Sequence, residues 1–133
     1  MINFFSKYKI IFYSINLGVI FLYLYPGSIF GWIMYGDLEI QPQITPDFFF
    51  KISSNHLYAF VVIAAIGIFS YQKPQEIKFL IVYLILLSII LELFHLFINA
   101  RTFQLGDLFG NLFGVIIVIC INFLIRKYEF FRK

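Results

Sequence analysis

Residues 79–98 read FLIVYLILLSIILELFHLFI, and this stretch decides the fold. The run is apolar apart from a few positions, of which Ser88, Glu92 and His95 are the most polar. A helix needs roughly 20 predominantly apolar residues to cross the hydrocarbon core of a bilayer. The run is long enough for such a crossing, so it predicts a transmembrane helix.

The rest of the chain has the same character. Further apolar segments at 8–25, 56–71 and 108–125 approach or reach the length of a membrane crossing. The chain is 62% hydrophobic and only 13% charged, whereas soluble domains carry about a quarter charged residues. Such a composition cannot cover a surface that faces water, which excludes a soluble globular protein. We predict an all-α fold, with residues 1–133 forming one polytopic domain of four transmembrane helices.

The basic residues orient these helices. With four crossings, both chain ends and the turn between the second and third helices lie on one side of the membrane. Of the ten Lys and Arg residues, the other side carries only Lys51 and Arg101. The remaining eight are Lys7, Lys9, Lys73, Lys78, Arg126, Lys127, Arg132 and Lys133. Basic residues favour the cytoplasmic side, so we expect both termini in the cytoplasm and the protein in a bacterial cytoplasmic membrane. Because the basic residues form no stripe, we expect no nucleic-acid partner.

The outward loop at 26–55 is unusually aromatic. Its apolar residues include Phe30, Trp32, Tyr35 and the Phe48-Phe-Phe run. Aromatic rings are favoured at the interface between membrane and water. We expect this loop to lie on the outer leaflet, either as a simple anchor or as a surface that captures a lipid or a partner helix.

Polar residues on the third helix share one face. Ser88, Glu92, His95 and Asn99 follow one another at i, i+4, i+7 and i+11. Polar side chains at membrane depth face the bundle interior or a hydrated cavity. A carboxyl group at such depth costs about 2.5–3.5 kcal/mol on insertion scales. Glu92 therefore needs a partner or a proton.

Further polar residues lie near the outer ends of the neighbouring helices. Together they form a predicted polar cluster: His56, Glu92, His95, Arg101, Asp107 and Asn111. On the last helix, Gly110 and Gly114 form a small-xxx-small pair, which lets two helix backbones approach closely. On the first helix, Ser14, Asn16 and Gly18 are also expected to serve helix packing.

The order of these residues resembles the VanZ-like family of small bacterial membrane proteins. The family has Glu-x-x-Gln, then Arg-x-Phe, then Asp-x-x-x-Asn-x-x-Gly, after an upstream His-Phe-x-x-Phe. The matching stretches here are His56-Leu-Tyr-Ala-Phe60, Glu92-Leu-Phe-His95, Arg101-Thr-Phe103 and Asp107-Leu-Phe-Gly-Asn111-Leu-Phe-Gly114. His95 replaces the family Gln, and Ile52-Ser53 replaces an Asp-Lys pair. The resemblance implies a role in the cell envelope, since the founding member is tied to low-level resistance to the glycopeptide teicoplanin.

Three functions remain open at this point. In the first, Glu92 pairs with Arg101 or His95, and Asp107 with Arg101, in a network that fixes the bundle of an accessory subunit of a membrane assembly. In the second, the cluster binds the headgroup of an envelope lipid or cell-wall precursor, with Arg101 on its phosphate.

The third function is an enzyme that acts on such a lipid. Glu92 or His95 would act as a general base, but no nucleophile lies nearby, because Ser88 is deeper and Cys120 lies towards the inner half. A metal held by Glu92, His95, His56 and Asp107 is conceivable. Carboxylate-bridged bundles use paired Glu-x-x-His motifs, however, and this chain has one copy. We therefore predict no catalytic residue, metal or cofactor, with membrane lipids and other membrane subunits as partners.

Overall fold

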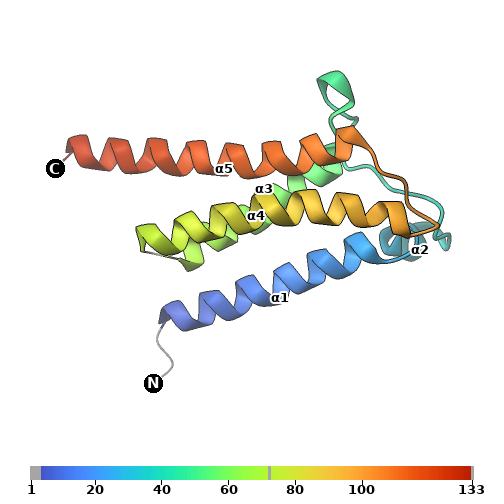
Figure 1. The fold of residues 1–133 in the computed structure, drawn as a ribbon, viewed down its shortest axis with the longest axis horizontal. Coiled ribbons are helices and arrows are strands. Elements are labelled where there is room, and N and C mark those ends of the chain that lie inside the picture. Colours follow the sequence, from blue (N-terminus) through green and yellow to red (C-terminus); the bar gives the residue numbers. More distant parts are fainter. Residues whose placement is uncertain (1–3, 72, 133) are drawn as a thin grey trace.

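The computed structural model describes residues 4–71 and 73–132, and these form a bundle of helices (Figure 1). The elements are α1 (Phe4–Leu24), α2 (Ile29–Tyr35), the 3-10 turn η1 (Phe49–Lys51), α3 (Ser54–Ser70), α4 (Pro74–Phe94), the 3-10 turn η2 (His95–Phe97) and α5 (Leu105–Arg132). The described residues form no strand, and an isolated bridge joins Phe48 to Ile52. The predicted all-α class is confirmed.

The four long helices overlap the four predicted segments, but each begins earlier than predicted, and α4 ends at Phe94 instead of Ile98. α4 begins at Pro74 instead of Phe79, and both the proline and Glu76 lie in its first turn. Both residues favour a helix start, because proline lacks an N–H that would go unpaired and a carboxylate complements the helix dipole. The hydropathy of a segment therefore marks its apolar part, while the helix itself continues into polar surroundings.

Two described helices are long and apolar enough to cross a membrane. They are Pro74–Phe97, which includes η2, and Leu105–Tyr128, each of 24 residues. α1 meets the same test only together with α2, from which it is bent by 81°. α3 is a shorter apolar helix. The length and composition of these helices are those of a membrane protein.

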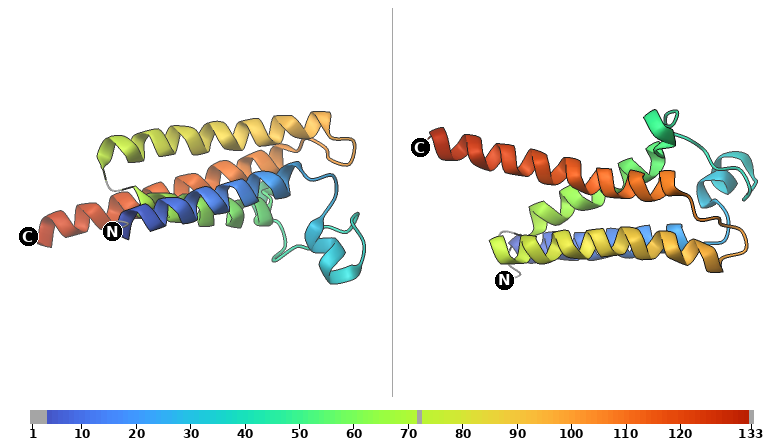
Figure 2. Two further views of the ribbon diagram at one scale, coloured as in Figure 1. Left: turned by 90° about the horizontal axis from the view of Figure 1, so that it is seen from below. Right: turned by 45° about the horizontal axis from the view of Figure 1, so that its top comes forward.

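The long helices alternate in direction (Figure 1). α1 begins and α5 ends at one end of the bundle, which we call the terminal end. α1 and α4 end, and α3 and α5 begin, at the opposite end, which we call the cluster end. Figure 2 shows α3 crossing obliquely among the other long helices, with α2 and its loop beyond the cluster end.

The core of the bundle surrounds α3. Phe60 and Ile63 of α3 are completely buried, and they belong to the same apolar cluster as Phe12 of α1, Leu84 of α4 and Val115 of α5. α3 packs most extensively against α5 and next against α1. Because α3 is enclosed on several sides, residues at its first turn are placed among the other helices.

Glycines allow α3 and α5 to approach closely. A Cβ atom added at Gly110 would lie 2.6 Å from the carbonyl oxygen of Ser53, and one at Gly114 would lie 2.6 Å from that of Leu57. Both distances are shorter than van der Waals contact, so only glycine fits without a shift of the backbone. The glycine pair thus faces α3, and the close approach brings the first turns of α3 and α5 together.

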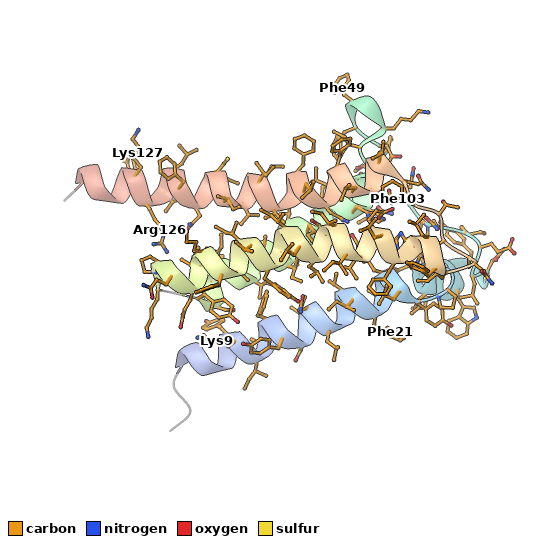
Figure 3. The ribbon with its side chains drawn as sticks, viewed as in Figure 1. Lys9, Phe21, Phe49, Phe103, Arg126 and Lys127 are labelled. Atoms are coloured by element: carbon orange, nitrogen blue, oxygen red, sulfur yellow. The ribbon has the colours of Figure 1, made fainter. Side chains whose placement is uncertain are left out.

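α2 forms a short helix at the cluster end. Its first turn is capped by the Ser28 hydroxyl, which accepts a hydrogen bond from the Gly31 N–H at 3.0 Å, and its last turn ends at Gly36 in the left-handed region (φ 70°). The side chains of Phe30 and Trp32 are exposed. Phe49 is 88% exposed at the tip of the protruding η1 turn (Figure 3). Aromatic rings therefore surround the cluster end on its outside.

Candidate functional site

The predicted polar cluster assembles at the cluster end of the bundle. His56 lies in the first turn of α3, Glu92 in the last turn of α4, and Asp107 in the first turn of α5. Glu92 and Asn111 are 0% exposed and His95 is 3% exposed, while the side chains of His56 and Asp107 are 17% and 16% exposed. The antiparallel order of the helices is what brings these termini together.

Glu92 is paired with the N-terminus of α5. Its Oε1 accepts a hydrogen bond from the backbone N–H of Gln104 at 2.8 Å, and α5 begins at the next residue. The N-terminus of a helix presents unpaired N–H groups and a partial positive charge. A buried carboxylate is stabilised there without a basic side chain.

His95 contacts Glu92 and α1. Its Nδ1 lies 3.4 Å from Glu92 Oε2, and its Nε2 lies 3.0 Å from the carbonyl oxygen of Tyr23. Because a carbonyl oxygen only accepts, Nε2 carries a proton. The contact between Nδ1 and Glu92 Oε2 is attractive when a second proton lies between these two atoms.

Tyr23 is a member of the cluster that the sequence did not reveal. Its hydroxyl donates to Asn111 Oδ1 at 2.7 Å, and its ring packs edge-on against the His56 ring at 4.8 Å between centroids. The chain has nine tyrosines, most of them at helix ends or on apolar faces. Nothing in the sequence distinguishes this one, because its role depends on where α1 meets α5.

His56 and Asp107 form a second contact between α3 and α5. The distance from His56 Nε2 to Asp107 Oδ2 is 3.6 Å. The two residues are on the first turns of helices whose close approach is set by Gly110 and its neighbours. This contact is nearer to the surface than the one between Glu92 and His95.

Arg101 does not form the predicted ion pairs. Within the described part of the chain, its hydrogen bonds go to carbonyl oxygens at the C-terminal end of α1: Leu22 at 3.3 Å, Tyr25 at 3.3 Å and Gly27 at 2.6 Å. The end of a helix exposes unpaired carbonyls and a partial negative charge, which a guanidinium group satisfies. Burial lowers the pKa of Arg101, and the carboxylate of Asp107 opposes that shift. An arginine nevertheless stays charged at neutral pH.

The predicted polar face of the third helix ends early. Ser88 is buried and donates to the carbonyl of Ile85 at 2.7 Å. Asn99, however, is exposed, so its predicted place on the same buried face as Ser88, Glu92 and His95 is wrong. The reason is that α4 ends at Phe94 and η2 follows, and a 3-10 turn rotates successive residues differently from an α-helix.

The cluster is a closed polar network more than an open cleft. Two hollows lie outside it: one of about 360 Å³ between α1 and α4 near the terminal end, lined by Phe12, Tyr13, Phe79 and Tyr83 among others, and one of about 280 Å³ beside α2, lined by Tyr25, Ile29, Trp32 and Leu38. Cys120 is exposed on α5, nine residues beyond Asn111, or roughly 13 Å along the helix. Cys120 is therefore distant from Glu92, and the hydroxyl of Ser88, one turn from Glu92 on α4, donates to the Ile85 carbonyl.

This chain matched no protein-family model, no curated protein and no solved structure. The resemblance to the VanZ-like family thus stands on the motif residues alone. Function has to be inferred from the geometry of the polar cluster and from the surface around it.

Proposed function

We propose that this chain is a VanZ-like protein of the bacterial cytoplasmic membrane that crosses the bilayer four times and serves as an accessory subunit of a membrane assembly. The observation that carries the proposal is the polar network at the cluster end. It joins α1, α3, α4 and α5 through Tyr23, His56, Glu92 and Asn111. Such a network holds four apolar helices in one fixed arrangement.

Two features support four crossings with both termini in the cytoplasm. α3 has 17 residues, which extend over about 25 Å and reach the lower limit of roughly 17 residues for a crossing. Basic residues gather at the terminal end, where Figure 3 shows Lys9, Arg126 and Lys127. The side chains of Lys7 and Arg132, and the whole of Lys133, lie outside the described residues.

The contacts within the cluster favour a structural role over headgroup binding or catalysis. Arg101 would be the natural phosphate ligand, but its Nε and Nη2 already donate to α1 carbonyls. Glu92 is fully buried and holds the start of α5. Groups that are occupied in holding helices together are poorly placed to take up a lipid headgroup or a proton from a substrate.

One face of α1 offers a place for a partner helix. Ser14 and Gly18 are exposed and one turn apart, and a Cβ atom added at Gly18 would meet nothing within 4 Å. Small residues at this spacing let helices approach closely in membranes, yet among the residues that the structure describes nothing packs on Gly18. We take this face as the contact with a transmembrane helix of another subunit.

Affinity purification in mild detergent tests the proposal. We expect a membrane protein to copurify with the wild-type chain and to be lost with Gly18→Ile, while the variant itself is extracted as a stable, monodisperse protein. Leu17→Ile, on the same exposed surface, is the matched control that should keep the partner. A wild-type chain that is isolated without any protein partner, and whose native mass spectrum shows a retained polyprenyl phosphate, would overturn the accessory role in favour of headgroup binding.

Reporter fusions test the topology separately. A fluorescent protein that folds only in the cytoplasm should be bright at either terminus, and alkaline phosphatase should be active when inserted in the loop at 37–47. Activity of the phosphatase at one terminus would contradict four crossings.

A further inference from the structure

Three side chains of the polar cluster have the composition of a metal site. His56, Glu92 and Asp107 each offer one ligand atom, a ring nitrogen or a carboxylate oxygen, and these three atoms lie within 4.8 Å of one another. They come from three different helices, α3, α4 and α5. The fold therefore gathers two carboxylates and an imidazole that are far apart in the sequence.

Two buried atoms of these residues lack a hydrogen-bond partner among the described residues. They are His56 Nδ1 and Glu92 Oε2, and the second of these lies 3.4 Å from His95 Nδ1 without forming a hydrogen bond. Buried polar atoms are paired in the great majority of cases, and each exception calls for an explanation. The side chain of Glu92 is completely enclosed, so bulk water does not provide its partner. A cation suits two neighbouring carboxylates and an imidazole nitrogen together.

From this geometry we propose that His56, Glu92 and Asp107 bind one divalent ion of a first-row transition metal. Imidazole favours such ions over Mg²⁺ and Ca²⁺, and carboxylates complete mixed nitrogen and oxygen sites. Ligand atoms lie about 2.0–2.2 Å from a bound Zn²⁺, so the three side chains would have to draw together on binding. The proposal concerns the ligands alone and does not depend on the accessory role.

The surroundings of the three residues fit this assignment. Metal-binding carboxylates are usually held by hydrogen bonds of their own, and Glu92 Oε1 is fixed by the Gln104 N–H at 2.8 Å. The partial exposure of His56 and Asp107 leaves a path for the ion and room for water as a further ligand. His95 is not one of the ligands, because its Nε2 donates to the Tyr23 carbonyl and its Nδ1 faces Glu92 Oε2 at 3.4 Å.

This arrangement differs from what the motif alone implies. Glu-x-x-His would place Glu92 and His95 on one helix as ligands, and its single copy gives no metal site. In the structure the imidazole comes from α3, and the second carboxylate comes from α5. The close approach of α3 and α5 brings His56 beside Asp107, and the last turn of α4 adds Glu92.

The test uses full-length protein in detergent, without an affinity tag and stripped with a chelator. Titration with Co²⁺ should give d–d absorption bands that saturate at one ion per chain, and Zn²⁺ should displace the Co²⁺ and raise the unfolding temperature. Asp107→Asn and His56→Gln should each weaken Zn²⁺ binding at least tenfold. Glu76→Gln, which changes a carboxylate at the terminal end, is the matched control and should leave binding unchanged.

A second measurement does not rely on variants that fold. Cu²⁺ added to the wild-type protein should show coupling to nitrogen from one imidazole in its electron paramagnetic resonance spectrum. Coupling to two imidazoles would overturn the exclusion of His95, and Mg²⁺ binding more tightly than Zn²⁺ would overturn the class of metal. If stripped wild-type protein shows neither Co²⁺ bands nor stabilisation by Zn²⁺, the site itself is refuted, and the accessory role is untouched.

Discussion

The two ends of the bundle treat charge in opposite ways. At the cluster end, Glu92 is enclosed at the N-terminus of α5 and Arg101 is partly buried at the C-terminus of α1. At the terminal end, Lys9 and Glu76 form an ion pair at 3.4 Å with about a third of each side chain exposed (34% and 33%). At the cluster end Glu92 and Arg101 are matched with backbone groups of helix ends, in addition to the contact of Glu92 with His95, whereas at the terminal end Lys9 and Glu76 are matched with each other.

The difference shows how this chain places buried and partly buried charged groups. Each helix end leaves unpaired backbone groups and a partial charge of known sign. Glu92 lies at the partly positive N-terminus of α5, and Arg101 lies at the partly negative C-terminus of α1. In each case the charge of the side chain and the partial charge of the helix end compensate one another. The chain thereby needs no direct ion pair between the two residues.

The largest effect is expected from Glu92→Ala. The change leaves the Gln104 N–H and His95 without their partner, and removing one member of a buried charged pair costs about 3–5 kcal/mol. Thermal unfolding of the detergent-extracted protein, followed by size-exclusion chromatography, should show a large loss of stability. Glu92→Gln should lose less, since its side-chain oxygen still accepts from Gln104. Equal stability of wild type and Glu92→Ala would erase the contrast between the two ends.

A smaller loss is expected from Arg101→Ala. The variant removes one short hydrogen bond to the Gly27 carbonyl and two longer ones to Leu22 and Tyr25. We expect a total loss of about 1.5–3 kcal/mol, the usual contribution of one hydrogen bond from a charged donor, because Arg101 is only partly buried and water can replace the longer contacts. Arg101→Lys, which keeps the charge but lacks the planar fork of donors, should fall between Ala and wild type. The same unfolding assay measures both variants. If lysine is no better than alanine, charge at the end of α1 is not what matters.

Glycine substitutions extend the comparison to packing. Gly114→Ala should cost about 1–3 kcal/mol as an overpacked contact, because its Cβ would lie 2.6 Å from the Leu57 carbonyl oxygen. Gly18→Ala should be neutral or stabilise by up to about 1 kcal/mol through helix propensity, since its Cβ meets nothing within 4 Å. The unfolding temperature should therefore fall for Gly114→Ala and stay the same or rise for Gly18→Ala. Equal shifts would contradict the α3–α5 interface.

The smallest effect is expected from Glu76→Gln at the terminal end. Exposed ion pairs contribute about 0.2–1 kcal/mol, and salt screens them. The unfolding temperature should change little in low salt and not at all in high salt. A loss as large as that of Glu92→Ala would mean that the terminal end is as tightly organised as the cluster end.

Much of the cluster was predictable because it depends on local spacing. Glu92 and His95 share a helix face within one turn, and apolar surroundings require that face to be buried. The predicted burial of Asn99 on the polar helix face was wrong because the prediction continued an α-helix past Phe94, where the chain changes to a 3-10 turn. The predicted ion pairs of Arg101 were wrong for another reason. The prediction considered only side-chain partners and left out the backbone carbonyls of α1, which is distant in the sequence.

The sequence by itself determined that this protein is helical and where its long helices lie, because the length and period of apolar runs are local properties of the chain. It also selected the residues that must be buried, because each polar group within an apolar run needs a partner. Only the tertiary structure decided which partners they find. The pairing of Arg101 with α1, the role of Tyr23 and the meeting of His56 with Asp107 all depend on how helices cross. That crossing is set by the fit of surfaces such as Gly110 and Gly114 on α3, which no single segment contains.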